Sequence, residues 1–197
     1  VDFIDEREAR DAVVAREILS AQEILTPRLG GLPWYEKPLL GYALEIAGAS
    51  LTHDTPLGSR VLRAVAAVLL TVLVGAIGVR HFGKPAGACA AVVFATSLAL
   101  PVAARSDGTQ VLAAGLTWGA IGLWLEALTR GPTTWRLLVA YGSLSIVMLI
   151  AGPVPALWPF AAMALTLSRA RRWTLWARLQ PVAGLVLIAG LMLPWYG

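Results

Sequence analysis

Long uncharged apolar runs dominate the chain after about residue 60, whereas polar and apolar positions alternate before it. A helix that crosses a bilayer needs about 20 mostly apolar residues. Candidate runs lie at 61–79, 86–104, 108–126, 133–151, 154–170 and 179–196. We therefore predict an all-α integral membrane protein with about six transmembrane helices.

Two local patterns indicate how these helices pack. The fourth and fifth runs are joined by "AGPVPA" at 151–156, where proline lacks a backbone donor and restricts the preceding residue. This predicts a tight helical hairpin. Gly115 and Gly119 form a GxxxG pattern, which predicts the close approach of a neighbouring helix.

The first 60 residues have helical periodicity of another kind. Val14, Ile18, Ala21 and Leu25 recur at helical spacing and predict an amphipathic helix over 8–25, lying along the membrane interface. "TPRLGGLP" at 26–33 forms a turn, and a second short helix follows Pro38. The prediction is therefore an extracytoplasmic loop with two amphipathic interfacial helices at 1–60, followed by a transmembrane helical bundle at 61–197.

The distribution of charge predicts the orientation. The chain of 197 residues is 57% hydrophobic and only 14% charged, unlike soluble domains. Lys and Arg gather in the short loops at 80–84, 130–136 and 169–178, which the positive-inside rule places in the cytoplasm. Residues 1–60, which carry 10 of the 12 acidic residues, then face outward. The formal charge of +4 forms no continuous basic face, so a nucleic-acid partner is not expected.

Several kinds of site are not predicted. The sequence has no phosphate-cradling glycine loop and no serine nucleophile elbow. The single cysteine, Cys89, and the absence of a second histidine near His53 argue against a metal site. The predicted spans carry almost no ionisable residues away from their ends, which disfavours a transporter.

The segment "REARDAVVAREILSAQEILTPRLGGLPWYEKPLLGYAL" at 7–44, with "LGSRVLRAVAAVLLTVLV" after it and a final "LPWY", resembles a known family. It is similar to the membrane core of the C-type glycosyltransferases that use polyprenyl-phosphate sugars, in the aminoarabinose-transferase and bacterial protein O-mannosyltransferase branch. The resemblance implies a bacterial inner-membrane enzyme that transfers a sugar from a polyprenyl-phosphate donor to an extracytoplasmic acceptor. Relatives are longer, so we expect a piece of a longer chain, or a processed one.

The resemblance also implies which residues bind the lipid phosphate. Lys37 in "WYEKP" matches a family lysine near that phosphate, Arg10 matches the motif arginine, and Arg60 matches a further arginine. Each has a structural alternative: Lys37 snorkels or pairs with Glu36, Arg10 pairs with the residue four positions earlier, and Arg60 anchors at headgroups. Arg63 has the same headgroup alternative.

The catalytic carboxylate is less clearly placed. Aligning "AREIL" puts Glu8 and Arg10 on the family motif, but Arg7 then takes the place of the aspartate that is catalytic in relatives. Asp5 and Glu6 come too early, and a displacement of two helical residues rotates a side chain by about 200°. Either a local slip brings Asp5 or Glu6 into the site, or Glu8 substitutes, or the site is degenerate.

Other contributions are left open. Arg105 and Asp107 lie in a predicted outer loop, where they either join the site or form a simple cap with a weak salt bridge. No cofactor is certain, and a divalent cation is the one candidate. Expected partners are membrane lipids, the polyprenyl-phosphate sugar and membrane protein subunits. The alternative function is a truncated or degenerate relative that acts as a structural subunit of a larger membrane complex.

Overall fold

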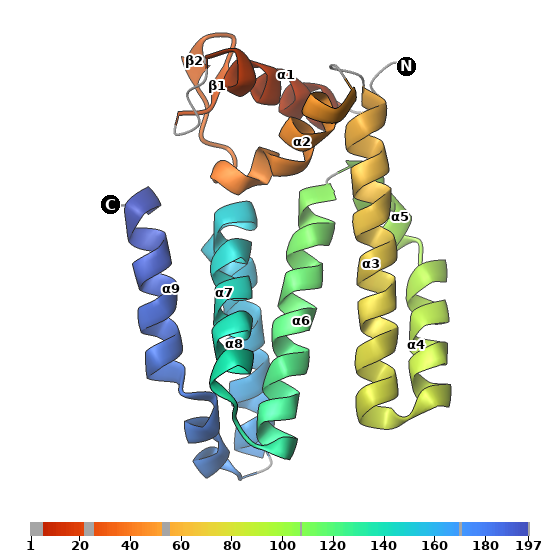
Figure 1. The fold of residues 1–197 in the computed structure, drawn as a ribbon, viewed down its shortest axis with the longest axis vertical. Coiled ribbons are helices and arrows are strands. Elements are labelled where there is room, and N and C mark those ends of the chain that lie inside the picture. The colour runs from red at the N-terminus through yellow and green to blue at the C-terminus, as the bar shows by residue number, and fades with distance from the viewer. Residues whose placement is uncertain (1–5, 22–25, 53–55, 107, 170, 197) are drawn as a thin grey trace. The chain divides into compact units, whose positions relative to one another are not determined.

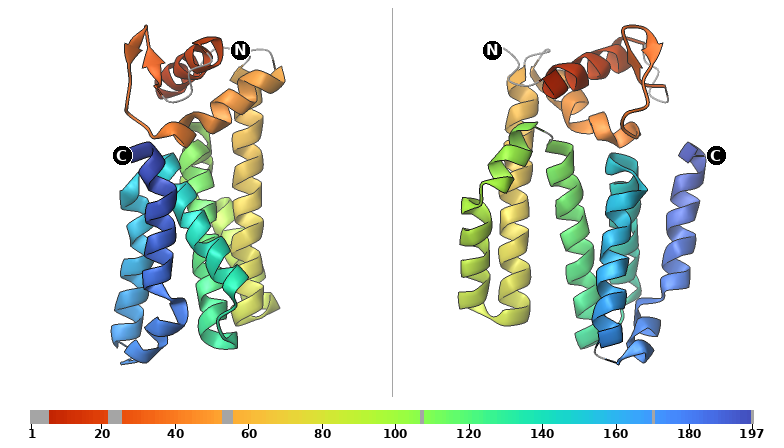
Figure 2. Two further views of the ribbon diagram at one scale, coloured as in Figure 1. Left: turned by 60° about the vertical axis from the view of Figure 1, so that its left-hand side comes forward. Right: turned by 180° about the vertical axis from the view of Figure 1, so that it is seen from behind.

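The computed structural model describes residues 6–21, 26–52, 56–106, 108–169 and 171–196, and these residues are almost entirely helical (Figures 1 and 2). This confirms the helical class that the hydropathy pattern predicts. The chain divides into two compact units, 1–115 and 116–197.

The first unit contains the N-terminal helices, a small hairpin and the first long apolar helices. Its elements are α1 (Glu6–Ala21), β1 (Arg28–Leu29), β2 (Leu32–Pro33), the 3₁₀ helix η1 (Leu39–Tyr42), α2 (Ala43–Thr52), α3 (Pro56–Phe82), α4 (Lys84–Thr96), α5 (Ala99–Ser106) and the beginning of α6 (Gly108–Arg130). The second helix predicted after Pro38 is therefore present, as η1 and α2.

The second unit contains the rest of α6, then α7 (Thr134–Ala151), α8 (Pro153–Arg169), η2 (Trp173–Leu179) and α9 (Pro181–Tyr196). The predicted hairpin between α7 and α8 is confirmed, and Gly152 makes the turn at a φ of 84°. Trp124, Tyr141 and Phe160 pack ring against ring in its core. The hydroxyl of Tyr141 donates to the Leu179 carbonyl at 2.7 Å.

The apolar face of α1 is buried inside the first unit. Val14 and Ile18 pack against Tyr42, and the cluster is completed by Leu29, Trp34 and Ile46. The predicted amphipathic stripe therefore covers protein at these positions. Its placement along a membrane interface stays a prediction.

A two-residue turn connects β1 and β2. Gly30 and Gly31 have φ values of 63° and 81°, the left-handed conformations that a tight hairpin of this kind requires. The Glu17 carboxylate accepts both of their backbone N–H groups, at 2.8 and 3.2 Å. These bonds attach the hairpin to α1. The segment that contains Lys37 follows directly after β2 of this hairpin.

Three helices are long and apolar enough to cross a membrane: Leu57–Phe82, Gly108–Arg130 and Thr134–Ala151. Two bent pairs raise the number to five if each counts as one span: Lys84–Thr96 with Ala99–Arg105, bent by 53°, and Trp173–Leu179 with Pro181–Leu193, bent by 41°. The six predicted spans are therefore not confirmed in the described part of the chain. In the first pair Pro101 falls in the first turn of α5, where a missing donor is tolerated and a new helix can begin.

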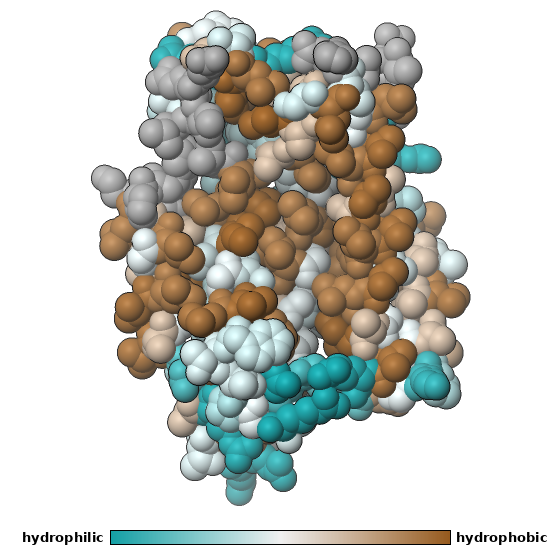
Figure 3. Space-filling model, in the orientation of Figure 1, coloured by the Kyte–Doolittle hydropathy of each residue, from teal (hydrophilic) through white to brown (hydrophobic). Residues whose placement is uncertain are grey.

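Apolar side chains gather over α3 in the view of Figure 3. The exposed apolar residues of α3 include Val61, Val65, Val68 and Val72. The helix also makes close backbone contacts through glycine. A Cβ on Gly48 of α2 would meet the Ser59 backbone, and one on Gly78 would lie 2.7 Å from the Gly87 Cα of α4. A Cβ on Gly115 would meet Leu70 at an ordinary 3.8 Å, so the close approach predicted for the GxxxG pattern is not found at Gly115.

Candidate functional site

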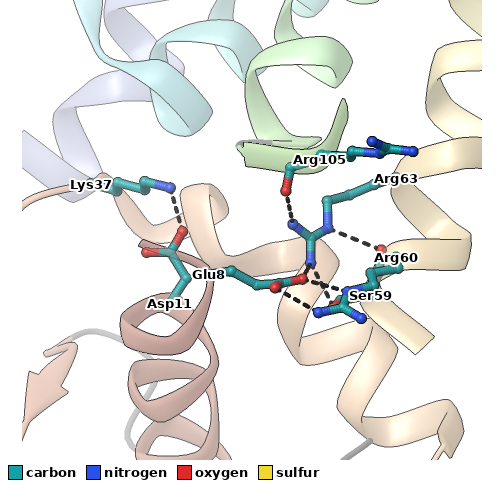
Figure 4. A network of polar contacts seen from close by, with 7 residues as sticks. All are labelled: Glu8, Asp11, Lys37, Ser59, Arg60, Arg63 and Arg105. Atoms are coloured by element: carbon teal, nitrogen blue, oxygen red, sulfur yellow. Dashed lines mark hydrogen bonds and ion pairs between the residues drawn. The ribbon is translucent and has the colours of Figure 1, made fainter. Parts of the chain in front are cut away.

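Glu8 of α1 is bound by two arginines of α3 (Figure 4). Arg60 donates from Nε to Oε1 and from Nη2 to Oε2, both at 2.9 Å. Arg63 donates from Nη2 to Oε1 at 2.6 Å. Such a fork between a guanidinium and a carboxylate combines charge with fixed geometry. Glu8 is only 3% exposed, so the pairs fasten α1 to α3.

Arg63 is the buried centre of this network, at 1% exposure. It donates to the Ser59 hydroxyl at 3.0 Å and to the Arg105 carbonyl at 3.0 Å. Its aliphatic part lies over Gly108, where any Cβ would collide with it. The headgroup-anchor interpretation of Arg63 is therefore wrong, because the guanidinium is directed into the protein and holds a buried carboxylate.

Lys37 forms an ion pair with Asp11 of α1, at 2.6 Å between Nζ and Oδ2. The Lys37 side chain is 16% exposed and that of Asp11 is 7% exposed. The cation is thus the more accessible member of the pair (Figure 4). Sequence reasoning considered Glu36 as the partner of Lys37 and did not select Asp11.

Arg10 lies at the edge of the same region. Its Nε is 3.6 Å from Glu36 Oε2, and its guanidinium carbon is 5.8 Å from the centre of the Trp34 ring. The Trp34 indole donates to the same Glu36 oxygen at 3.2 Å. Arg10 is therefore paired with Glu36 of the "WYEKP" motif, whereas Glu6, its predicted helical partner, is exposed.

Two buried groups, Glu45 and Tyr42, feel the charge of Asp11. Glu45 is 6% exposed, and its Oε2 has no hydrogen-bond partner among the described residues. Burial raises the pKa of the Glu45 carboxyl to about 7, against the pull of Arg63, and the charge of Asp11 adds to the rise. Burial, followed by the charge of Asp11, also raises the pKa of the Tyr42 hydroxyl. Both groups hold their protons more firmly than they would in water.

The two ion pairs of α1 are neighbours. Glu8 and Asp11 are three residues apart in one helix, a spacing that puts side chains on adjacent turns of the same face. Arg60 and Lys37, held by these two carboxylates, are consequently brought to one side of α1 from segments distant in the sequence. The predicted phosphate-binding residues Arg60 and Lys37 thus belong to one cluster.

A cavity of about 390 Å³ lies beside Arg60. Three turns of α3 line one wall, and α4 and α5 line the other; the lining residues are Arg60, Ala64, Ala67, Ala95, Leu100, Pro101, Ala104 and Arg105. Arg60 is the first of these residues on α3, and Arg105 lies near the end of α5, where its carbonyl meets Arg63. The cavity therefore has apolar walls and two arginines at one end.

Some predicted residues are not placed. Asp5 and Asp107 lie outside the described residues. Arg7, at the position where the resemblance leads us to expect an aspartate, is within α1. No group of three or more His, Cys, Asp or Glu side chains in the described ranges could hold a metal ion. The residues that sequence reasoning missed are Asp11 and Glu45. Asp11 carried a usable signal, because it follows Glu8 by three residues in the same helix.

No protein-family model matches the chain. Among solved structures, two of ArnT from Cupriavidus metallidurans, an aminoarabinose transferase, are similar to it: one in the apo state and one bound to undecaprenyl phosphate. Each has a TM-score of 0.88 at 21% sequence identity, over 98% of this chain and 37% of the ArnT chain. The chain thus spans about 37% of the length of ArnT. The predicted resemblance to the membrane core of C-type glycosyltransferases is confirmed as a fold.

Proposed function

We propose that the protein binds a polyprenyl-phosphate sugar at the cluster between α1 and α3 and transfers the sugar to an extracytoplasmic acceptor. The bacterial inner membrane is its location, with residues 1–60 on the extracytoplasmic side. The observation that most directly supports this proposal is the cavity of about 390 Å³. Its walls are apolar, and Arg60 and Arg105 lie at one end. An apolar chain with an anionic headgroup has the matching chemistry.

The fold supports the choice of ligand. A structure with a TM-score of 0.88 to this chain is that of ArnT bound to undecaprenyl phosphate. In the proposal, the prenyl chain lies along the alanine-lined wall of α3. The phosphate is met by Arg60, Lys37 and Arg10, with Arg105 as a further contributor at the same end of the cavity. Guanidinium and ammonium groups stabilise phosphate both as a bound ligand and as a leaving group.

The reaction needs a proton acceptor as well as these cations. An acceptor hydroxyl must lose its proton as it attacks the anomeric carbon, and a carboxylate is suited to that role. Asp5, Glu6 and Glu8 are the candidates from the resemblance. Glu8 is held by three bonds from two arginines, which favours an anchoring role for it. A divalent cation stays the candidate cofactor and would share the charge of the phosphate. The described residues offer it no group of three His, Cys, Asp or Glu side chains, so no step is assigned to it.

The test is binding of undecaprenyl phosphate by the full-length protein in phosphatidylcholine nanodiscs. We expect saturable binding, and about ten-fold weaker binding after Lys37→Ala or Arg105→Ala, since a lost charge-assisted contact costs about 1.5 kcal/mol or more. Arg130→Ala is the control, because Arg130 is an exposed arginine at the end of α6. Equal losses in all three variants would mean general attraction of an anionic lipid and would contradict the site.

The same experiment addresses the alternative, a structural subunit of a larger membrane complex. A wild-type protein that binds no undecaprenyl phosphate, and that is purified under mild conditions only with other membrane proteins, would favour the subunit.

A further inference from the structure

The second unit carries a large excess of positive charge. Residues 116–197 contain six arginines, no lysine and a single carboxylate, that of Glu126. Glu126, near the end of α6, already lies 3.5 Å from Arg136 in the first turn of α7. The unit's own carboxylate therefore cannot balance its charge. An anion supplied from outside the unit would do so.

The 3₁₀ helix η2 lies at the end of this unit where the arginines gather. Residues in the left-handed conformation flank it, Arg171 with a φ of 51° and Gln180 with a φ of 48°, and η2 is bent by 41° from α9. Leu179 is buried and Trp176 packs against the core of the unit, whereas Trp173 is 56% exposed. A tryptophan at the surface beside arginines is typical of a segment at the level of the lipid headgroups.

A shallow groove of about 60 Å³ begins beside η2 and runs between α7 and α9. Its walls are formed by residues from Thr134 to Tyr141 on one helix and from Gln180 to Leu187 on the other. Thr134 and Gln180 are the polar residues at one end, and the lining residues after them are leucine, alanine, glycine and tyrosine. Gly184 brings α9 directly onto the Tyr141 ring, since any Cβ there would collide with that ring. The groove thus has a polar mouth and an apolar interior about 10 Å long.

Two arginines are close in the chain to the mouth of this groove. Arg178 precedes Gln180 by two residues and Arg136 follows Thr134 by two, and two residues of chain span at most about 7 Å. The Arg178 side chain is exposed, and its Nη1 donates to the Leu128 carbonyl at 3.2 Å. A guanidinium has five N–H donors, so Arg178 is fixed in place and still has donors to offer an anion.

We propose that the second unit binds one anionic phospholipid of the cytoplasmic leaflet, with its phosphate on Arg178 and one acyl chain in the groove between α7 and α9. The ligand class is a glycerophospholipid whose headgroup carries a net negative charge, such as phosphatidylglycerol. Arg178 donates charge-assisted hydrogen bonds to the phosphate, and Arg136 adds to the positive potential at the mouth. The site is separate from the proposed function, because it uses no residue of the first unit and its lipid is not a sugar donor.

The position of the groove favours a lipid over an acidic protein. Helix α7 is long and apolar enough to cross a membrane, and η2 with α9 passes the same test as a bent pair. The interior of the groove then lies at the depth of acyl chains and its mouth at the depth of headgroups. In Figure 3 hydrophilic residues gather around η2 and the end of α6, next to an apolar surface. An acidic protein would pair with Arg178 but would leave the apolar interior of the groove without a ligand.

The test is native mass spectrometry of the full-length protein in mild detergent, titrated with phosphatidylglycerol or with phosphatidylcholine. We expect one phosphatidylglycerol to bind saturably, and about five-fold more weakly after Arg178→Gln, because a basic residue that attracts the phosphate is lost. Ala183→Phe places a ring in the groove, and we expect binding about ten-fold weaker or less, because the acyl chain loses its apolar contacts. Phosphatidylcholine, which has no net charge, should bind more weakly than phosphatidylglycerol.

Each variant has a matched control. Ala189→Phe adds the same ring at an exposed position of α9 that does not line the groove. Arg80→Gln removes the same charge from an exposed position near the end of α3. Both controls should bind phosphatidylglycerol as wild type does. Arg178→Gln changes an exposed side chain, so the test stays decisive even where Ala183→Phe does not fold.

Several results would overturn the proposal. Equal losses in Arg80→Gln and Arg178→Gln would mean general attraction of anionic lipid to a basic surface. Unchanged binding in a folded Ala183→Phe protein would mean that the groove holds no acyl chain. Tight binding of polyglutamate in place of phosphatidylglycerol would favour an acidic protein partner. Undecaprenyl phosphate should bind Arg178→Gln as it binds wild type, and weaker binding there would assign the groove to the polyprenyl lipid instead.

Discussion

Glu45 is a buried carboxyl of the first unit with an unsatisfied oxygen. It is nearly fully buried on α2, its Oε2 has no hydrogen-bond partner among the described residues, and burial raises its pKa to about 7. A buried carboxyl without partners is costly when charged and much less so when protonated. The protonation of Glu45 is therefore coupled to the stability of the fold around α1 and α2.

Glu45→Gln tests this coupling. The folded-state pKa of about 7 is above the ordinary 4.5, so the folded protein holds the proton more tightly. The contribution of Glu45 to the free energy of unfolding is fully present below pH 4.5 and is lost as the pH rises to 7. Above pH 7 it does not change further. The loss is on the order of 3 kcal/mol.

We therefore expect the melting temperature of Glu45→Gln in mild detergent to exceed that of wild type by several degrees at pH 8 and by little at pH 5. Glu6→Gln, at an exposed position of α1, should show no such pH-dependent gap. A difference between Glu45→Gln and wild type that is the same at both pH values would contradict the account.

At the residue scale, the sequence predicted the basic residues of the cluster better than it predicted the carboxylates that pair with them. Lys37 and Arg60 fall in one cluster, as the motif suggested. Their carboxylates are 26 and 52 residues away in the chain, and the packing of α1 on the hairpin and on α2, which itself packs on α3, decides those pairings. Glu8 was one of the alternatives for the base, and its pairing with Arg63 was not predicted, because a basic residue near a helix end gives no sign of whether it faces headgroups or protein.

Helix α2 is held against α3 by close backbone contact. A Cβ on Gly48 would collide with the Ser59 backbone, and one on Gly58 would collide with Thr52 and the Gly48 carbonyl. Backbone atoms cannot move aside as a flexible side chain can. The contact matters to the site because Ser59, Arg60 and Arg63 lie on the same part of α3.

Gly48→Ala and Gly142→Ala form a matched pair of substitutions. Gly48→Ala should destabilise the protein by about 1–3 kcal/mol, because the added methyl group forces α2 from α3. Gly142 lies within α7 with nothing within 4 Å of an added Cβ, so Gly142→Ala should be neutral or stabilising by up to about 1 kcal/mol. Melting temperatures in one detergent measure both, and equal effects would contradict the contact.

At the element scale, hydropathy predicted the long helices well and their interruptions poorly. The runs at 61–79, 108–126 and 133–151 became α3, α6 and α7. The run at 86–104 is apolar throughout, yet it breaks between α4 and α5 because Ser97 adopts an extended conformation, with ψ of 138°. A hydropathy average over many residues does not reveal a single residue in an extended conformation. The prolines and the glycine at 151–156, in contrast, predicted the α7–α8 hairpin.

For the whole molecule, the fold is supported by the comparison with ArnT, whereas the chemistry is a proposal from the residues of the cluster and the cavity. Helical architecture and similarity to ArnT over 98% of this chain establish the fold. The chain covers 37% of ArnT, and the transfer reaction and its acceptor belong to the proposal. The boundary predicted at residue 60 and the outward orientation of 1–60 stay predictions, since the compact units divide at 115 and no membrane is part of the structure.

The central claim is that a lipid phosphate binds at Lys37, with its prenyl chain in the cavity beside Arg60. The most direct measurement is a cryo-electron microscopy structure of the full-length protein in nanodiscs with undecaprenyl phosphate. We predict phosphate density within hydrogen-bonding distance of the Lys37 ammonium, with the prenyl chain in the cavity beside Arg60. Undecaprenyl phosphate bound elsewhere would contradict the claim.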